Sequence, residues 1–160
     1  MKKLNIEIMI MYWVSVLIFR GVGIESLRLM LVGAVLMKLS REDIKGHRLP
    51  DRIIMIGCAV SLLRIFEGDT VAELALGVIP AISVLAVVLI LDMIRNRSTL
   101  GGGDIKMMFM IGLNFGMYRT FVIILIAGIL FVAVDLLHDR QHNLPFGPML
   151  ALASWMAIIK

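Results

Sequence analysis

Long apolar segments alternate with short polar segments along the whole chain. The sequence contains seven apolar segments, at about residues 4–19, 26–40, 53–66, 71–94, 105–117, 120–137 and 144–159. A helix needs roughly 20 mostly apolar residues to cross the hydrocarbon core of a bilayer. We therefore predict six or seven transmembrane helices, with 53–66 and 105–117 extending into flanking polar residues to reach that length. Gly77 and Pro80 lie inside 71–94 and predict a kink there.

The composition places this pattern in a membrane. Hydrophobic residues make up 60% of the 160 residues and the mean hydropathy is +0.96, which excludes an ordinary soluble domain. Because backbone groups in lipid must satisfy their own hydrogen bonds, we predict an all-α, polytopic integral membrane helix bundle forming a single domain, 1–160. Lys2 and Lys3 before the first apolar segment are typical of a secretory signal, but no small-residue cleavage site follows, so we expect a retained helix.

The basic residues predict the orientation of the bundle. With the N-terminus inside, eleven basic residues fall on the inner side and five on the outer side. The inner residues are Lys2, Lys3, Lys38, Arg41, Lys45, Arg48, Arg52, Arg95, Arg97, Lys106 and Arg140, and the outer residues are Arg20, Arg28, Arg64, Arg119 and Lys160. This distribution follows the positive-inside rule. Because the basic residues lie in short loops between apolar segments, the net charge of +4 does not indicate a nucleic-acid partner.

Two acidic residues return to the same predicted face. Two crossings separate Asp43 from Asp104, so both carboxylates lie on the cytoplasmic side, each at a helix end beside helix-breaking residues. Ionisable groups at membrane depth are costly and mark functional sites. Asp92 and Asp135 also lie near inner ends, so this argument does not rank the four acids. Asp104 follows Gly101–Gly103 directly and is either a helix cap or a reactive group.

Two facing carboxyl groups can hydrolyse a peptide bond without a metal or cofactor. Such a pair shares a proton, so that one group acts as a base on water and the other as an acid. Cys58 is the only cysteine, which excludes a disulfide or a thiolate zinc site within one chain. The three histidines, His47, His138 and His142, match no common zinc spacing, and we predict no metal site.

Three sequence segments, 43–51, 101–106 and 144–151, together resemble the type IV prepilin peptidase family of GxGD membrane aspartyl proteases. Residues 43–51, DIKGHRLPD, resemble the family's first aspartate segment, and 101–106, GGGDIK, resemble its Gly-x-Gly-Asp segment. Residues 144–151, LPFGPMLA, resemble the Pro-Phe-Gly-Pro start of its last helix. Together they place the family core at 26–160 and leave 1–25 as an additional N-terminal helix region.

The resemblance implies residue roles. Asp43 and Asp104 would be the catalytic pair, and Gly101 and Gly103 would let the backbone approach the substrate. Pro50, Pro145, Gly147 and Pro148 belong to the structural motifs.

Three further residues have two interpretations each. Lys106 either favours the ionised form of Asp104 or extends to the membrane interface. Glu42 and Asp51 either attract a basic leader or balance neighbouring arginines, which are Arg41, Arg48 and Arg52. Asp51 stands where the family usually has Asn.

The implied substrate is a prepilin or pilin-like protein, whose short basic leader would be removed at the cytoplasmic face of the cell membrane. The lipid bilayer is then the second partner. The chain resembles the short forms associated with tight-adherence pili and protein secretion, with archaeal preflagellin peptidases as a neighbouring possibility. Residues 1–42 do not resemble the paired CxxC region of the long forms, so we expect peptidase activity without N-methylation. An inactive membrane scaffold and a small proton-coupled transporter remain alternatives, and the sequence does not specify the oligomeric state.

Overall fold

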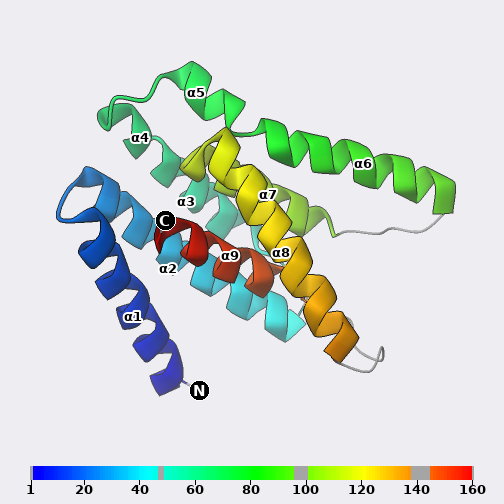
Figure 1. Cartoon of the computed structure of the whole chain (residues 1–160), viewed down its shortest axis with the longest axis horizontal. Coiled ribbons are helices and arrows are strands. Elements are labelled where there is room, and N and C mark those ends of the chain that lie inside the picture. The colour runs from blue at the N-terminus through cyan, green and yellow to red at the C-terminus, as the bar shows by residue number, and fades with distance from the viewer. Residues whose placement is uncertain (1, 47–48, 96–100, 138–144, 160) are drawn as a thin grey trace.

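The structure is a computed structural model, and it describes residues 2–46, 49–95, 101–137 and 145–159. All regular secondary structure in these ranges is helical (Figure 1). The helices are α1 (Lys2–Arg20), α2 (Ile24–Gly46), α3 (Asp51–Ser61), α4 (Leu63–Phe66), α5 (Val71–Leu76), α6 (Ile79–Arg95), α7 (Gly102–Phe115), α8 (Met117–Leu137) and α9 (Gly147–Ile159). Each predicted apolar segment therefore forms helix, which confirms the all-α class.

Two of the predicted segments are broken. The segment 53–66 divides into α3 and α4 at Leu62, which sequence analysis did not predict. The segment 71–94 divides at Gly77 and Val78, where a kink was expected, and Pro80 falls in the first turn of α6, where its missing N–H costs nothing. A Cβ on Gly77 would lie 2.2 Å from the carbonyl oxygen of Gly112, so glycine allows this break to pack against α7.

Two helical stretches are long and apolar enough to cross a membrane, Val71–Ile94 and Met117–Leu137. Only 28% and 17% of their most apolar windows are buried inside the protein. Helices that are apolar on all sides and mostly exposed are typical of contact with lipid, because exposing so much apolar surface to water is energetically unfavourable. In Figure 1, α6 extends away from the rest of the bundle, which agrees with its low burial.

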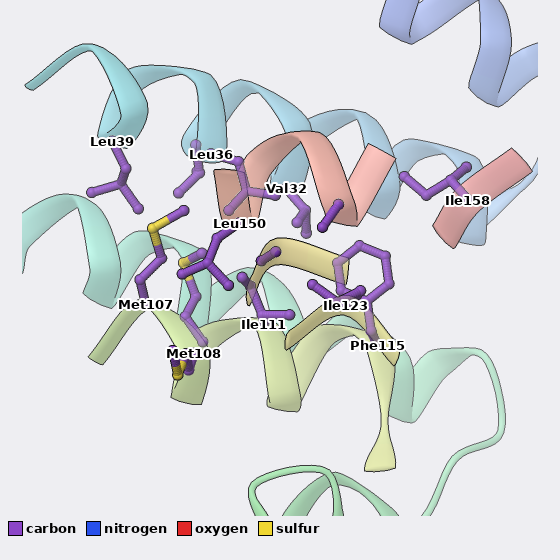
Figure 2. Packing of buried hydrophobic residues seen from close by; sticks show 14 of the residues in the cluster. Val32, Leu36, Leu39, Met107, Met108, Ile111, Phe115, Ile123, Leu150 and Ile158 are labelled. Atoms are coloured by element: carbon purple, nitrogen blue, oxygen red, sulfur yellow. The ribbon is translucent and has the colours of Figure 1, made fainter. Parts of the chain in front are cut away.

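The core lies between α2, α7, α8 and α9, and α3 packs on its side (Figure 2). Three methionines of α7, Met107, Met108 and Met110, are fully buried in it. Met110 lies against Gly57 of α3, where a Cβ would come within 2.1 Å of its sulfur. The unbranched methionine side chains fill the irregular space that these helices leave.

Helix α1 packs on α2 and α9. The Tyr12 hydroxyl donates a hydrogen bond to the Leu29 carbonyl at 2.8 Å, and the Tyr12 ring occupies the space beside Gly33. Trp155 of α9 donates to the Ser15 hydroxyl at 3.0 Å. The expected additional N-terminal helix is thus an integrated part of the bundle.

Candidate active site

Asp43 is a buried carboxylate in the last turn of α2. Its side chain belongs to the few polar groups in the described interior, with 5% of the residue exposed. The backbone N–H of Gly147 donates a hydrogen bond to Asp43 Oδ2 at 2.8 Å. Gly147 begins α9, so the carboxylate meets the end of a helix whose N–H groups lack intrahelical partners and whose dipole is positive. This contact joins two of the three sequence segments.

Gly147 is the residue type that this contact requires. A Cβ at position 147 would lie 2.7 Å from Asp43 Oδ2, closer than van der Waals contact permits. Pro148 follows in the first turn of α9, and Pro145 precedes the helix. The motif therefore brings a backbone donor against Asp43. Sequence reasoning assigned Gly147 only a role in helix shape, and a glycine at the start of a helix was the signal for a close approach.

Asp104 lies in the first turn of α7. Gly101 is the N-cap residue of this helix, so Asp104 is its third residue rather than its cap. The Asp104 N–H donates to the Gly101 carbonyl at 3.0 Å, and a Cβ on Gly101 would lie 3.1 Å from Asp104 Oδ2. A carboxylate in a first turn interacts favourably with the helix dipole. Glycine at position 101 therefore avoids a close contact with the Asp104 carboxylate.

Asp43 and Asp104 lie at the same end of the molecule. In Figure 2, the labelled residues of α2 run Leu39, Leu36, Val32 in the direction in which those of α7 run Met107, Ile111, Phe115, so the two helices are antiparallel. Leu39 and Met107 point toward each other at one end of this core. Asp43 follows Leu39 by one helical turn, and Asp104 precedes Met107 by about one turn, roughly 5–6 Å along each axis. Asp43 and Asp104 therefore lie at the same end of these two helices, past Leu39 and Met107.

The segment between the two aspartates connects α2 to α7. A Cβ on Gly103 would lie 2.9 Å from Leu49 Cδ1, so Gly103 allows Leu49 to pack against the start of α7. Pro50 is the N-cap residue of α3. Lys106 of α7 bonds to Asp51 of α3, with Nζ 2.7 Å from Oδ1. These contacts hold the two sequence segments together beside the aspartates.

The Lys106–Asp51 pair gives both residues a partner that the sequence did not indicate. Lys106 was expected to act on Asp104 or to extend to the interface, and Asp51 to face a leader or nearby arginines. Their side chains are 55% and 66% exposed, and such surface pairs contribute about 0–1 kcal/mol. Glu42 is half-buried in the last part of α2.

The other two acids near predicted inner helix ends are less buried than Asp43, and Asp92 is half-buried near the end of α6. Asp135 is exposed near the end of α8, in contrast to the buried Asp43. His47, His138 and His142 lie outside the described residues. Within the described ranges, no three His, Cys, Asp or Glu side chains are grouped to hold a metal ion, and Cys58 is a half-buried free thiol.

Comparison with known proteins adds independent information on this chain. The model of the type IV leader peptidase family matches residues 29–136, a stretch that contains Asp43 and Asp104 and ends before Pro145. The curated prepilin leader peptidase/N-methyltransferase of Pseudomonas putida is 28% identical over 151 residues, which is 87% of this chain and 51% of that protein. The chain thus spans about half the length of this relative. No solved structure matches it.

Proposed function

Because this chain belongs to the type IV leader peptidase family, we propose that it is a membrane aspartyl endopeptidase that removes the basic leader of prepilins or pilin-like proteins. The observation that carries the proposal is Asp43, a buried carboxylate held by the Gly147 N–H at the end of the bundle to which Asp104 also belongs. The relative with a prepilin peptidase name supports the substrate class.

In the proposed mechanism the two aspartates act as a pair. One carboxylate takes a proton from a water molecule, whose oxygen attacks the carbonyl carbon of the scissile peptide bond. The other carboxyl group donates a proton to the carbonyl oxygen. When the tetrahedral intermediate collapses, the carbon–nitrogen bond breaks and the carboxyl group that took the proton from water gives it to the leaving amine. The other carboxylate recovers its proton from a hydroxyl group of the intermediate. The protons belong to the pair, since coupled carboxyl groups titrate together.

The helix ends suit a substrate that spans the membrane boundary. We propose that the chain crosses the cytoplasmic membrane six or seven times, with Asp43 and Asp104 on the cytoplasmic side. A basic leader would then remain in the cytoplasm while the apolar helix after it stays in lipid. Both aspartates lie in a terminal turn rather than in a helix centre, which favours this role over the proton pathway of a transporter.

The test is co-expression with a candidate pilin from the same genome, with leader removal followed by gel shift. We expect the parent to cleave, and Asp43→Asn and Asp104→Asn each to abolish cleavage. Asp135→Asn is the matched control, because it removes an exposed carboxylate from α8, and it should cleave like the parent. Cleavage by Asp43→Asn or Asp104→Asn would contradict the paired mechanism. No cleavage by a folded parent of any pilin in that genome would favour the scaffold.

Cleavage of a purified pilin precursor by the purified protein, at varied substrate concentration, tests leader recognition. We propose that Glu42 and Asp51 attract the basic leader and that Lys106, bound to Asp51, limits this attraction. The double variant Glu42→Gln/Asp51→Asn should raise KM for a basic leader severalfold and leave kcat unchanged, because uniform binding is lost. An unchanged KM would refute this role without affecting the catalytic assignment.

A further inference from the structure

Four arginines gather at the end of the molecule opposite Asp43 and Asp104. They come from α1, α2, α4 and α8 and are Arg20, Arg28, Arg64 and Arg119. With three acids, Glu25, Glu67 and Asp69, they line a polar pocket of about 600 Å³, the arginine pocket. Sequence analysis predicted that these arginines lie on one side of the membrane, and used them only to predict the orientation of the bundle. The tertiary structure brings them into one site.

Three of the arginines are engaged by the three acids. Arg28 binds Glu67 through two nitrogen–oxygen contacts of 2.7 and 3.0 Å. Arg64 Nε lies 2.6 Å from Asp69 Oδ2, and Arg20 lies 3.1 Å from Glu25.

Two of these arginines also bind the C-terminal end of α7. Arg28 donates to the Asn114 carbonyl at 2.5 Å, and Arg64 donates to the Leu113 carbonyl at 2.9 Å. Carbonyls in the last turn of a helix lack intrahelical partners, so these arginines have a structural task.

Arg119 is the fourth arginine of the pocket, after Arg20, Arg28 and Arg64 have been paired with the three acids. It is half-buried in the first turn of α8, and the described residues supply it with neither an ion pair nor a hydrogen bond. Four guanidinium groups against three carboxylates leave one positive charge in the arginine pocket. A cation near a helix N-terminus also opposes the helix dipole, so this position favours an added anion.

We propose that the arginine pocket binds a phosphate oxyanion, carried by an anionic lipid headgroup or by free phosphate, with Arg119 as its principal ligand. The planar guanidinium group matches phosphate in geometry and charge. Ile24 lines the pocket and is exposed. Phe19 and Tyr118, the sequence neighbours of Arg20 and Arg119, are also exposed, so apolar surface is available to the acyl chains of a bound lipid. This site is distinct from the proposed peptidase site and does not depend on it.

The test uses the delipidated full chain in a non-ionic detergent. Short-chain phosphatidylglycerol, short-chain phosphatidylcholine and inorganic phosphate are titrated separately, and binding is measured by thermal shift and by native mass spectrometry. We expect phosphatidylglycerol or phosphate to raise the melting temperature, and phosphatidylcholine to have a weaker effect. Arg119→Gln should raise the dissociation constant at least tenfold, and Arg119→Lys should restore part of the affinity. Arg52→Gln is the matched control, because it removes an exposed arginine from the first turn of α3, at the other end of the molecule.

Each outcome decides the proposal. A response to phosphatidylglycerol alone identifies a lipid headgroup, and a response to inorganic phosphate identifies the free ion, and either supports the site. Equal affinities for parent and Arg119→Gln, equal losses in Arg119→Gln and Arg52→Gln, or no response to either anion overturns it. The ligand-free melting temperature of each variant shows whether it is folded. If Arg119→Gln does not fold, Arg119→Lys decides. A folded Arg119→Lys with reduced affinity for phosphatidylglycerol or phosphate supports the proposal, and one with the affinity of the parent overturns it.

Discussion

Single side chains and single missing side chains shape the candidate active site. Asp43 keeps its place because Gly147 presents an N–H and no Cβ to its carboxylate. Gly103 similarly leaves space for Leu49, and Gly101 leaves space beside Asp104. In each case the glycine is required for the space it leaves and not for an unusual backbone conformation.

The Gly147 contact predicts the effect of one methyl group. Gly147→Ala should displace the Asp43 carboxylate, because the added Cβ would lie 2.7 Å from Oδ2. We expect cleavage to slow by roughly 10- to 100-fold, because small displacements of reacting groups can slow an enzymatic reaction by this factor. Gly128→Ala is the matched control, since a Cβ there meets nothing within 4 Å, and its cleavage rate should equal that of the parent. Equal rates in both variants would show that the Gly147 contact is not needed for activity.

The helices are positioned by contacts at their ends as much as along their sides. At its N-terminus, α7 is held by Leu49 against Gly103 and by the Lys106–Asp51 pair. At its C-terminus, Arg28 and Arg64 bind the last carbonyls. The pairs differ in burial, since Arg28 and Glu67 are 4% and 15% exposed. Only the pair at the C-terminus should therefore affect the stability of the bundle strongly.

We predict a large difference between these two pairs. Arg28→Gln should lower the free energy of unfolding by about 3 kcal/mol, because it leaves the Glu67 carboxylate, whose side chain is only 15% exposed, without its charge partner. Lys106→Gln should lower the free energy of unfolding by less than about 1 kcal/mol, because the side chains of Lys106 and Asp51 are both more than half exposed. Denaturant unfolding of both variants in the same detergent measures this. Comparable losses would contradict the assignment of α7 anchoring to the buried pair.

At the scale of the whole molecule, the bundle has two chemically different ends. Asp43, Asp104 and the Lys106–Asp51 pair lie at one end, and the arginine pocket lies at the other, because α2 and α7 run in opposite directions between them. Apolar side chains dominate the exposed surface of Val71–Ile94 and Met117–Leu137 between these ends. Such an arrangement suits a bundle whose two ends face opposite sides of a membrane.

Cysteine labelling in cells tests this orientation. Cys58→Ser removes the only cysteine, after which Val22→Cys and Lys45→Cys place single thiols at opposite ends, both on exposed residues. A membrane-impermeant maleimide should label Val22→Cys in intact cells, and Lys45→Cys only after permeabilisation. The reverse pattern would place the proposed active site outside the cytoplasm.

The sequence by itself determined the helices, the lipid-compatible surface and the residues that resemble the peptidase family. Hydropathy and helix-breaking residues act over a few neighbouring positions, so the seven apolar segments and the break near Gly77 could be predicted locally. Only the tertiary structure decided which distant groups meet. It joined Asp43 to Gly147, 104 positions apart, paired Lys106 with Asp51, and collected four arginines into one pocket. These contacts depend on how helices pack and on the space that glycines leave, and no local pattern contains that information.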